Sequence, residues 1–178
     1  LAEFDRHDII YTMTQKTDHP SYGYQLKHGA TSLTEAWDGP TVGKSQNHFM
    51  LGHIEEWFYK ELGGLNYFYN HITESYTITV KPQPVGDIKW TKVEHQLPAG
   101  TVKIHWSRND ADDKFQLQVT VPVNCSALVH VPARSIDDVT ESGHPLKQLN
   151  NGIAVHQFEN GRAVVEVGSG QYRFECSV

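Results

Sequence analysis

The chain has 178 residues, of which 38% are hydrophobic and 20% charged, and its formal net charge is -6. These values are typical of a soluble globular protein with one or two domains. No run is rich in lysine and arginine, and no apolar run approaches the ~20 residues of a membrane span, so we expect neither nucleic acid nor a membrane as a partner.

The chain starts at Leu1 rather than at a methionine, and the first residues already have a helical pattern. A charged segment followed by an apolar one is not found there, so we expect the region of any secretion signal to be missing. We therefore predict a piece of a longer protein that lacks its N-terminal part. Its compartment stays open between periplasm, exterior and cytoplasm.

Two short helices are predicted near the start. Residues 1–17 have a short amphipathic pattern, which Asp18-His19-Pro20 should break because the residue before a proline is pushed out of the helical region. Residues 21–27 predict one or two further turns, closed by Gly29.

The clearest helical pattern covers residues 45–62. Ser45 is a suitable N-cap and Gly63-Gly64 a strong stop, so Asn47 and His48 should lie in the first turn. One wide apolar face is expected on this helix, made of Met50, Ile54, Trp57, Phe58 and Leu62.

After Gly64 the pattern changes to alternation of apolar and polar residues, which predicts an antiparallel β-sandwich. Nine strands are expected, at residues 76–81, 88–96, 101–107, 114–121, 126–131, 136–140, 152–158, 162–167 and 171–176. Turn signals such as Asn150-Asn151-Gly152 and Asn160-Gly161 separate them. Two cysteines, Cys125 and Cys176, fall in strands and are expected to be unpaired, half-buried thiols.

The pattern divides the chain into helices at residues 1–64, a linker at residues 65–75 and a β-sandwich domain at residues 76–178. The β-domain is long enough for its own core. The helices are too few to bury their own apolar faces. They must pack on the sandwich, on another copy of the chain, or on helices that the chain lacks.

One stretch, His19–Gly52, combines carboxylates, histidines, aromatic residues and five glycines. This mixture suits a sugar pocket, since aromatic faces pack on sugar C–H groups and polar groups bind hydroxyls. The alternative is a surface loop between helices, and composition does not separate the two. Glu35 has no cation within eight residues except Lys27, which suits a general base. On the residues alone, a solvated glutamate at a helix end is favoured.

The other candidates have plain structural alternatives. His48 could bind a ligand or Glu35, but a surface or capping histidine is favoured on the residues alone. His48 and His53 lack the spacing of a metal-binding helix, so we predict no metal and no cofactor. Trp90 and Trp106 could be a carbohydrate platform, but alternating strands favour burial of both in the core.

The runs PSYGYQLKHGATSLTEAWDG and SQNHFMLGHIEEWFYKELGG resemble the C-terminal end of the α-L-rhamnosidases of glycoside hydrolase family 78. The later runs KPQPVGDIKW, VTESGHPL and VGSGQYRFE resemble the C-terminal β-domain of that family. The resemblance implies an α+β fragment: the last helices of an α/α six-hairpin barrel followed by an antiparallel β-sandwich. Tyr22 and Thr34 depart from the family pattern, which has tryptophan at both positions.

The resemblance also implies a chemistry. Family members invert the anomeric configuration with two carboxylic residues, and their substrates are rhamnose-containing glycosides or polysaccharides. Glu35 matches the general base, while the general acid belongs to an earlier stretch that this chain lacks. The substrate-binding positions implied are His48, Trp37, Asp38, Tyr22 and Asn47. The chain alone is therefore expected to fold but to be inactive, and to self-associate, fray or bury its helical face on the β-domain.

Two alternatives from other classes stay open. The β-sandwich could be a carbohydrate-binding module, which exposed tryptophans on one sheet face would favour. It could also be a structural domain that braces the barrel.

Overall fold

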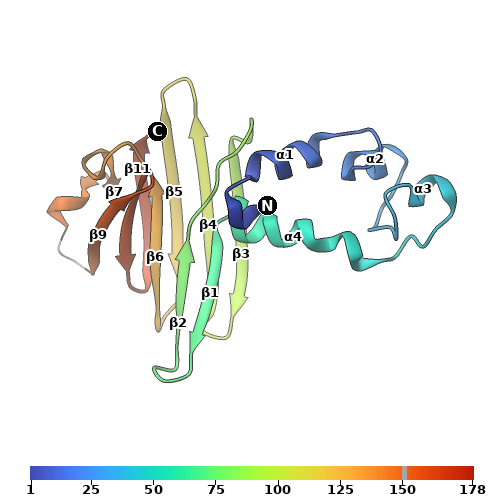
Figure 1. Ribbon diagram of the computed structural model, residues 1–178. Coiled ribbons are helices and arrows are strands. Elements are labelled where there is room, and N and C mark those ends of the chain that lie inside the picture. The colour runs from blue at the N-terminus through green and yellow to red at the C-terminus, as the bar shows by residue number, and fades with distance from the viewer. Residues whose placement is uncertain (150–151) are drawn as a thin grey trace. The chain divides into compact units, whose positions relative to one another are not determined.

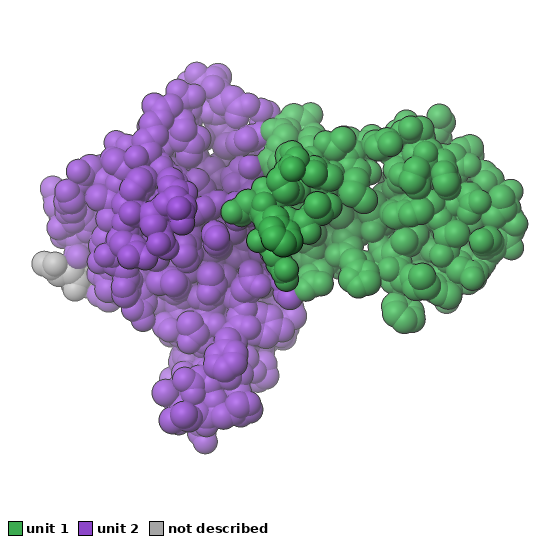
Figure 2. All heavy atoms as spheres, viewed as in Figure 1, with its two compact units in different colours: residues 1–58, 85–87 green, residues 59–84, 88–178 purple. Residues whose placement is uncertain are grey.

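The computed structural model describes residues 1–149 and 152–178, which form two compact units (Figure 2). Unit 1 comprises residues 1–58 and 85–87, and unit 2 comprises residues 59–84 and 88–178. The boundary at Phe58 lies a few residues before the Gly63-Gly64 stop at which the sequence pattern divides the chain. Among the described residues, no helix has the length and apolar character that crossing a membrane requires.

Unit 1 is built of short helices joined by long turns (Figure 1). Its elements are η1 (Ala2–Phe4), α1 (His7–Gln15), α2 (Tyr22–Lys27), α3 (Gly39–Val42), η2 (Phe49–Gly52) and α4 (His53–Trp57). The predicted signals act as expected: α1 ends before the proline, and the Ser21 hydroxyl caps α2 by accepting from the Tyr24 N–H at 3.0 Å. Gly29 follows α2 in the left-handed region, with φ of +83°.

The prediction of one helix over residues 45–62 is wrong in its first turn. Helical structure starts at Phe49 and passes through a 3₁₀ turn and α4 into the π-helical η3 (Phe58–Leu62). Residues 45–48 are instead held by backbone bonds to the segment around Leu33 and Glu35. Those tertiary bonds override the helical propensity, so Asn47 and His48 do not lie in a helical turn.

The five residues of the expected apolar face differ in burial. Trp57 and Leu62 are buried, and Ile54 is half-buried. Met50 and Phe58 stay 55% and 38% exposed. The Trp57 indole N–H donates to His7 Nδ1 at 3.1 Å, which ties α4 to the start of α1.

Unit 2 contains two sheets with the orders β1-β2-β6-β10-β9 and β3-β4-β5-β11-β7-β8. The strands are β1 (Leu65–Asn70), β2 (Ser75–Val80), β3 (Trp90–Leu97), β4 (Gly100–Asn109), β5 (Lys114–Val121), β6 (Cys125–Pro132), β7 (Thr140–Glu141), β8 (His144–Pro145), β9 (Ile153–Glu159), β10 (Arg162–Val167) and β11 (Gly170–Ser177). Strand pairs are antiparallel apart from β2 and β6, which run parallel. The inward residues of both sheets, among them Ile78, Val129, Ile104 and Phe174, form the core.

Several local predictions need correction. Residues 65–70, expected within a linker, form strand β1, because they pair along their whole length with β2. Residues 136–138, expected to begin a strand, form the 3₁₀ turn η4 (Ile136–Asp138); a second turn, η5 (Leu146–Gln148), follows β8. Two residues of the expected turn at Asn150-Asn151-Gly152 lie outside the described part of the chain.

The two tryptophans of the β-domain differ in burial. Trp106 is fully buried as expected, and its indole N–H donates to the Leu62 carbonyl at 2.7 Å. Trp90 is 63% exposed, so the prediction that it lies in the core is wrong. It occupies the first position of β3 on the face opposite to Val93, and strand alternation therefore directs it outward. Cys125 and Cys176 are free and are more deeply buried than expected.

Candidate active-site segment

Glu35 and His48 are thirteen residues apart in sequence but lie on neighbouring backbone segments. The Glu35 N–H donates to the Ser45 carbonyl at 2.9 Å, and the His48 N–H donates to the Leu33 carbonyl at 2.9 Å. The Ser32 hydroxyl is also bonded to the Gln46 carbonyl. These bonds pair residues 32–35 with residues 45–48 in opposite directions, which fixes the backbone of both candidate residues.

A buried polar pair, Gln25 and Thr34, packs against the hydrogen-bonded ladder that residues 32–35 and 45–48 form. Thr34 is fully buried, and its hydroxyl accepts from the Gln25 side-chain amide at 2.7 Å. The same hydroxyl donates to the Ala36 carbonyl at 2.7 Å, and the Gln25 amide reaches that carbonyl at 3.2 Å. Gly39 lies against this pair, because a β-carbon there would come within 2.8 Å of Thr34 Cβ. The turn that presents Glu35 is thus held by Gln25 and Thr34, neither of which is a predicted site residue.

The Glu35 side chain itself is exposed. Its Oε2 lies 3.4 Å from the Ser45 N–H, which points at the carboxylate. A backbone N–H at this distance helps to orient the group, while the rest of the carboxylate stays open to solvent. A positioned, accessible carboxylate can accept a proton from water.

Tyr22 and Trp37 form an aromatic corner beside the Glu35 turn. Their ring centroids are 4.8 Å apart with planes at 83°, an edge-to-face pair. The Tyr22 hydroxyl donates to the Leu51 carbonyl at 2.7 Å, and burial raises the pKa of this phenol. Trp37 and Asp38 are half-buried, and the Asp38 carbonyl accepts from the Thr41 N–H at the start of α3.

His48 and Asn47 close the other side of the ladder. His48 is half-buried, and its ring is stacked on Phe49 with centroids 6.2 Å apart and planes at 9°. Asn47 is exposed, and its N–H contacts the Ser45 hydroxyl at 3.4 Å. The structure thus gathers the segments of Glu35, His48 and Asn47 through the ladder, and pairs Tyr22 with Trp37.

Unit 1 has a concavity of about 460 Å³, and Tyr22 is the one candidate residue among the described residues that line it. Most of its lining is apolar, including Leu26, Leu33 and Ile54. Within residues 1–149 and 152–178, no three histidine, cysteine or acidic side chains are grouped in a way that could hold a metal ion.

Two family models match consecutive parts of the chain. Residues 1–62 match the bacterial alpha-L-rhamnosidase six-hairpin glycosidase domain, and residues 76–144 match the bacterial alpha-L-rhamnosidase C-terminal domain. The chain belongs to the bacterial alpha-L-rhamnosidase family. It corresponds to the last helices of the six-hairpin domain followed by the C-terminal β-domain.

Alpha-L-rhamnosidases with curated sequences align over nearly the whole chain. The protein from Streptomyces avermitilis is 29% identical over 98% of the chain and 16% of its own length. That from an Alteromonas species is 28% identical over 89% of the chain and 18% of its own length. The chain therefore spans less than a fifth of the length of these rhamnosidases.

Solved rhamnosidase structures have the same fold. The alpha-L-rhamnosidase from Dictyoglumus thermophilum superposes with a TM-score of 0.82 at 30% identity, over 100% of this chain and 20% of that one. The Streptomyces avermitilis enzyme, solved in complex with L-rhamnose, gives a TM-score of 0.80 at 26% identity, over 96% of this chain and 16% of its own.

Gln25 and Gly39, which support the Glu35 turn, are not among the residues predicted from the sequence. Gln25 lies in α2 and has the sequence pattern of an ordinary polar helix residue. Its burial, which marks it as a supporting residue, is seen only in the structure. The signal that could have found them is Thr34, which stands where the family pattern has tryptophan. A small side chain at that position leaves room that other groups must fill, and here Gln25 and Gly39 pack against it.

Proposed function

We propose that this chain is the C-terminal part of an inverting glycoside hydrolase that releases terminal α-L-rhamnose, and that Glu35 is its general base. The observation that supports this most is the ladder that fixes the Glu35 backbone beside His48 and aims the Ser45 N–H at its carboxylate. The family membership supports the substrate class.

The proposed reaction needs two carboxyl groups on opposite sides of the sugar. The Glu35 carboxylate accepts a proton from a water molecule while the water oxygen forms a bond to the anomeric carbon. The bond from that carbon to the leaving oxygen breaks, and a second carboxylic acid, outside this chain, protonates the leaving oxygen. In inverting enzymes the two groups stand about 6.5–9.5 Å apart, which leaves room for the water.

The remaining candidates have binding roles in this proposal. Trp37, held edge-to-face by Tyr22, offers an apolar surface to the C–H face of a rhamnose ring. His48, Asp38 and Asn47 supply hydrogen-bonding groups for its hydroxyls. Because rhamnose has a methyl group in place of a hydroxymethyl group, an aromatic wall with polar groups opposite suits it.

The test is Glu35→Gln in the longer enzyme that carries this segment. It should lower kcat on an aryl rhamnoside by a factor on the order of 10² or more, since the amide cannot accept the proton. Glu55→Gln makes the same chemical change at an exposed position of α4 in the same unit and should leave kcat within about two-fold. Turnover of Glu35→Gln near that of the unmodified enzyme would remove Glu35 from this role.

The 178-residue chain alone is proposed to fold without hydrolysing rhamnosides. A lone base cannot complete the reaction, because the leaving oxygen still needs its proton and the sugar its other contacts. Purified chain assayed on an aryl rhamnoside should give no turnover above the uncatalysed rate. Activity near that of an intact rhamnosidase would contradict the proposal.

Self-association of the chain is the companion proposal. Phe49 is 86% exposed and Met50 lies beside it, also exposed, which is apolar surface that soluble monomers rarely leave open. Light scattering should show a mass that rises with concentration, and the double variant Phe49→Ser/Met50→Ser should shift it towards the monomer. A monomer at every concentration would rule this out.

A further inference from the structure

The outer face of the six-stranded sheet is hollowed. Strand alternation turns Val93, Ile104 and Phe174 into the core, so their neighbours on β3, β4, β5 and β11 point away from it. These outward side chains line a concavity of about 590 Å³. It belongs entirely to unit 2 and contains none of the residues proposed for hydrolysis.

The strand register places four polar side chains in one row across this concavity. Lys92 lies opposite His105, His105 opposite Gln118, and Gln118 opposite Arg173. Neighbouring strands are ~4.8 Å apart, so the row is ~14 Å long, the length of a short oligosaccharide. Each side chain in the row carries a hydrogen-bond donor.

The concavity is more positive than the protein as a whole. Three cationic side chains line it, those of Lys92, Lys103 and Arg173, together with one carboxylate, Glu94. Glu94 is shared by two cations, with its oxygens 3.6 Å from Lys92 Nζ and 3.4 Å from Lys103 Nζ. Arg173 is itself paired with Glu175 at 2.6 Å, so the local positive charge comes from Lys92 and Lys103, which share the single carboxylate of Glu94. In a chain with a formal net charge of -6, this local positive charge favours a ligand that carries carboxylates.

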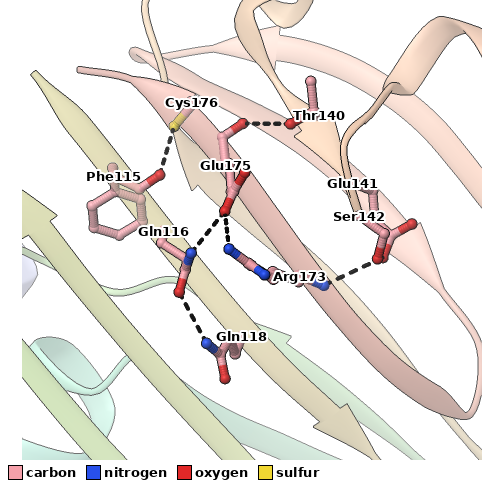
Figure 3. A network of polar contacts seen from close by, with 9 residues as sticks. All are labelled: Phe115, Gln116, Gln118, Thr140, Glu141, Ser142, Arg173, Glu175 and Cys176. Atoms are coloured by element: carbon pink, nitrogen blue, oxygen red, sulfur yellow. Dashed lines mark hydrogen bonds and ion pairs between the residues drawn. The ribbon is translucent and has the colours of Figure 1, made fainter. Parts of the chain in front are cut away.

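Two side chains of the row, Gln118 and Arg173, take part in a hydrogen-bond network (Figure 3). Gln118 donates to Gln116 at 2.9 Å, and Gln116 donates to Glu175 at 2.7 Å. Arg173 donates to the same Glu175 oxygen at 2.6 Å, and the bonds from Gln116 and Arg173 lower the pKa of this carboxyl. A ligand therefore meets Gln118 and Arg173 already held by hydrogen bonds, which reduces the entropy that these two side chains lose on binding.

An exposed tryptophan, Trp90, lies beside one residue of the concavity. Trp90 precedes Lys92 by two residues on β3, so both side chains point outward. Its ring meets that of His105, which lines the concavity, edge-on at 6.5 Å with planes at 87°. A large indole left 63% exposed beside a polar hollow is unusual for a structural residue and suits the apolar face of a sugar ring.

We propose that this face binds a short oligosaccharide that carries carboxylate groups, such as a chain of uronic acids, without cleaving it. Lys92 and Arg173 contact the carboxylates, Gln118 and His105 contact hydroxyls, and Trp90 packs against one ring. This binding goes beyond the proposed hydrolysis and does not depend on it.

The first experiment titrates the 178-residue chain with trigalacturonic acid by calorimetry at low salt. The control ligand is the neutral galactose trimer with the same linkage. The acidic trimer should bind saturably and at least ten-fold more tightly than the neutral one. Raising NaCl from 50 to 500 mM should weaken binding of the acidic trimer, because salt screens the attraction between its carboxylates and the cationic side chains. No saturable binding, or equal binding of both trimers, would overturn the proposal.

Matched variants locate the site. Lys92→Gln should weaken binding of the acidic trimer several-fold, whereas Lys147→Gln removes a similarly exposed lysine outside the concavity and should change it less than two-fold. Trp90→Ala should weaken binding about ten-fold, while Phe68→Ala removes an exposed aromatic ring from the other sheet and should leave it unchanged. Circular dichroism checks that each variant folds.

Two outcomes would overturn the location. One is an equal loss of binding in the test and control variants of either pair. The other is loss of binding in Glu35→Gln with retention in Trp90→Ala, which would place the sugar in unit 1. Loss of hydrolysis in the longer enzyme with Glu35→Gln bears only on the proposed base, so the two proposals fail separately.

Discussion

Gly64 lies against Pro82 so closely that a β-carbon on Gly64 would come within 2.3 Å of the Pro82 nitrogen. The Lys81 N–H donates to the Gly64 carbonyl at 2.8 Å, so the two segments cannot separate without loss of this bond. Gly64 also has a φ of +81°, in the region that side-chain-bearing residues avoid. This glycine is therefore required both by its own backbone angle and by the backbone packed on it.

A first prediction compares two glycine substitutions in the β-domain unit. At Gly161, with φ of +70°, no atom of the described residues lies within 4 Å of an added β-carbon, so Gly161→Ala should lower the free energy of unfolding by about 1–2 kcal/mol. Gly64→Ala adds the clash with Pro82 and should lower it by ~1–3 kcal/mol more. Urea denaturation followed by circular dichroism measures both. Equal losses would contradict the close approach.

A second prediction concerns the pair under the Glu35 turn. Gln25→Ala removes the donor to the buried Thr34 hydroxyl, one of its two hydrogen-bond partners, and should destabilise unit 1 by about 1–3 kcal/mol. Hydrogen exchange of the amides in residues 33–48 should accelerate, because the ladder rests on this pair. Gln15→Ala, at an exposed position of α1, is the control and should leave exchange there unchanged. Unaltered exchange in Gln25→Ala would show that the ladder is held by other groups.

The β-domain shows which elements can be predicted from the sequence and which cannot. The strands of the β-domain follow from alternation and turn residues, which act locally, and most are confirmed within a few residues. Strand β1 was missed because its residues Tyr67 and Phe68 are both exposed, so the alternation that marks a half-buried strand is lost. The strand exists because β2 supplies its hydrogen bonds, which local pattern does not encode.

The same limit applies to the site. The motif identified the segment of Glu35 and His48, but it placed His48 in a helix that starts only at Phe49. What holds His48 is the bond to Leu33, a residue fifteen positions away. Burial of Thr34 and exposure of Trp90 likewise depend on which segments pack together.

A third prediction concerns the two thiols. Burial and the nearby Asp138 raise the pKa of Cys176 to about 12, and its thiol donates to the Pro132 carbonyl at 2.8 Å. Burial also raises the pKa of Cys125. Since the thiolate is the reactive form, iodoacetamide at pH 8 should label neither residue in the folded protein at an appreciable rate. Both should react within minutes in 6 M guanidinium. Rapid labelling of one thiol in native protein would contradict its burial.

A fourth prediction concerns pH. Burial and then the positive charges of Lys81 and Arg162 lower the pKa of His130 in the folded protein, with Glu159 acting in the opposite direction. The unfolded chain therefore binds the proton more readily, with a pKa near 6.5. Above pH 6.5 the lowered pKa of His130 does not change the free energy of unfolding. As pH falls below 6.5, it lowers the free energy of unfolding, because the unfolded chain takes up the proton first.

His130→Gln should consequently reduce the loss of stability between pH 7 and pH 5, measured as the shift of the urea midpoint. The same substitution at the exposed His144 controls for the chemical change. An unchanged shift in His130→Gln would show that other groups cause the acid sensitivity.

The parallel pairing of β2 with β6 has a consequence for synthesis of the protein. Between these two strands the chain builds β3, β4 and β5, which all belong to the other sheet. On the ribosome, the β1–β2 hairpin must therefore wait with an open edge until residue 125 and beyond have emerged, and such edges attract other chains. We expect the meander of β3, β4 and β5 to form first, and the free edge of β2 to be paired only once β6 has been made.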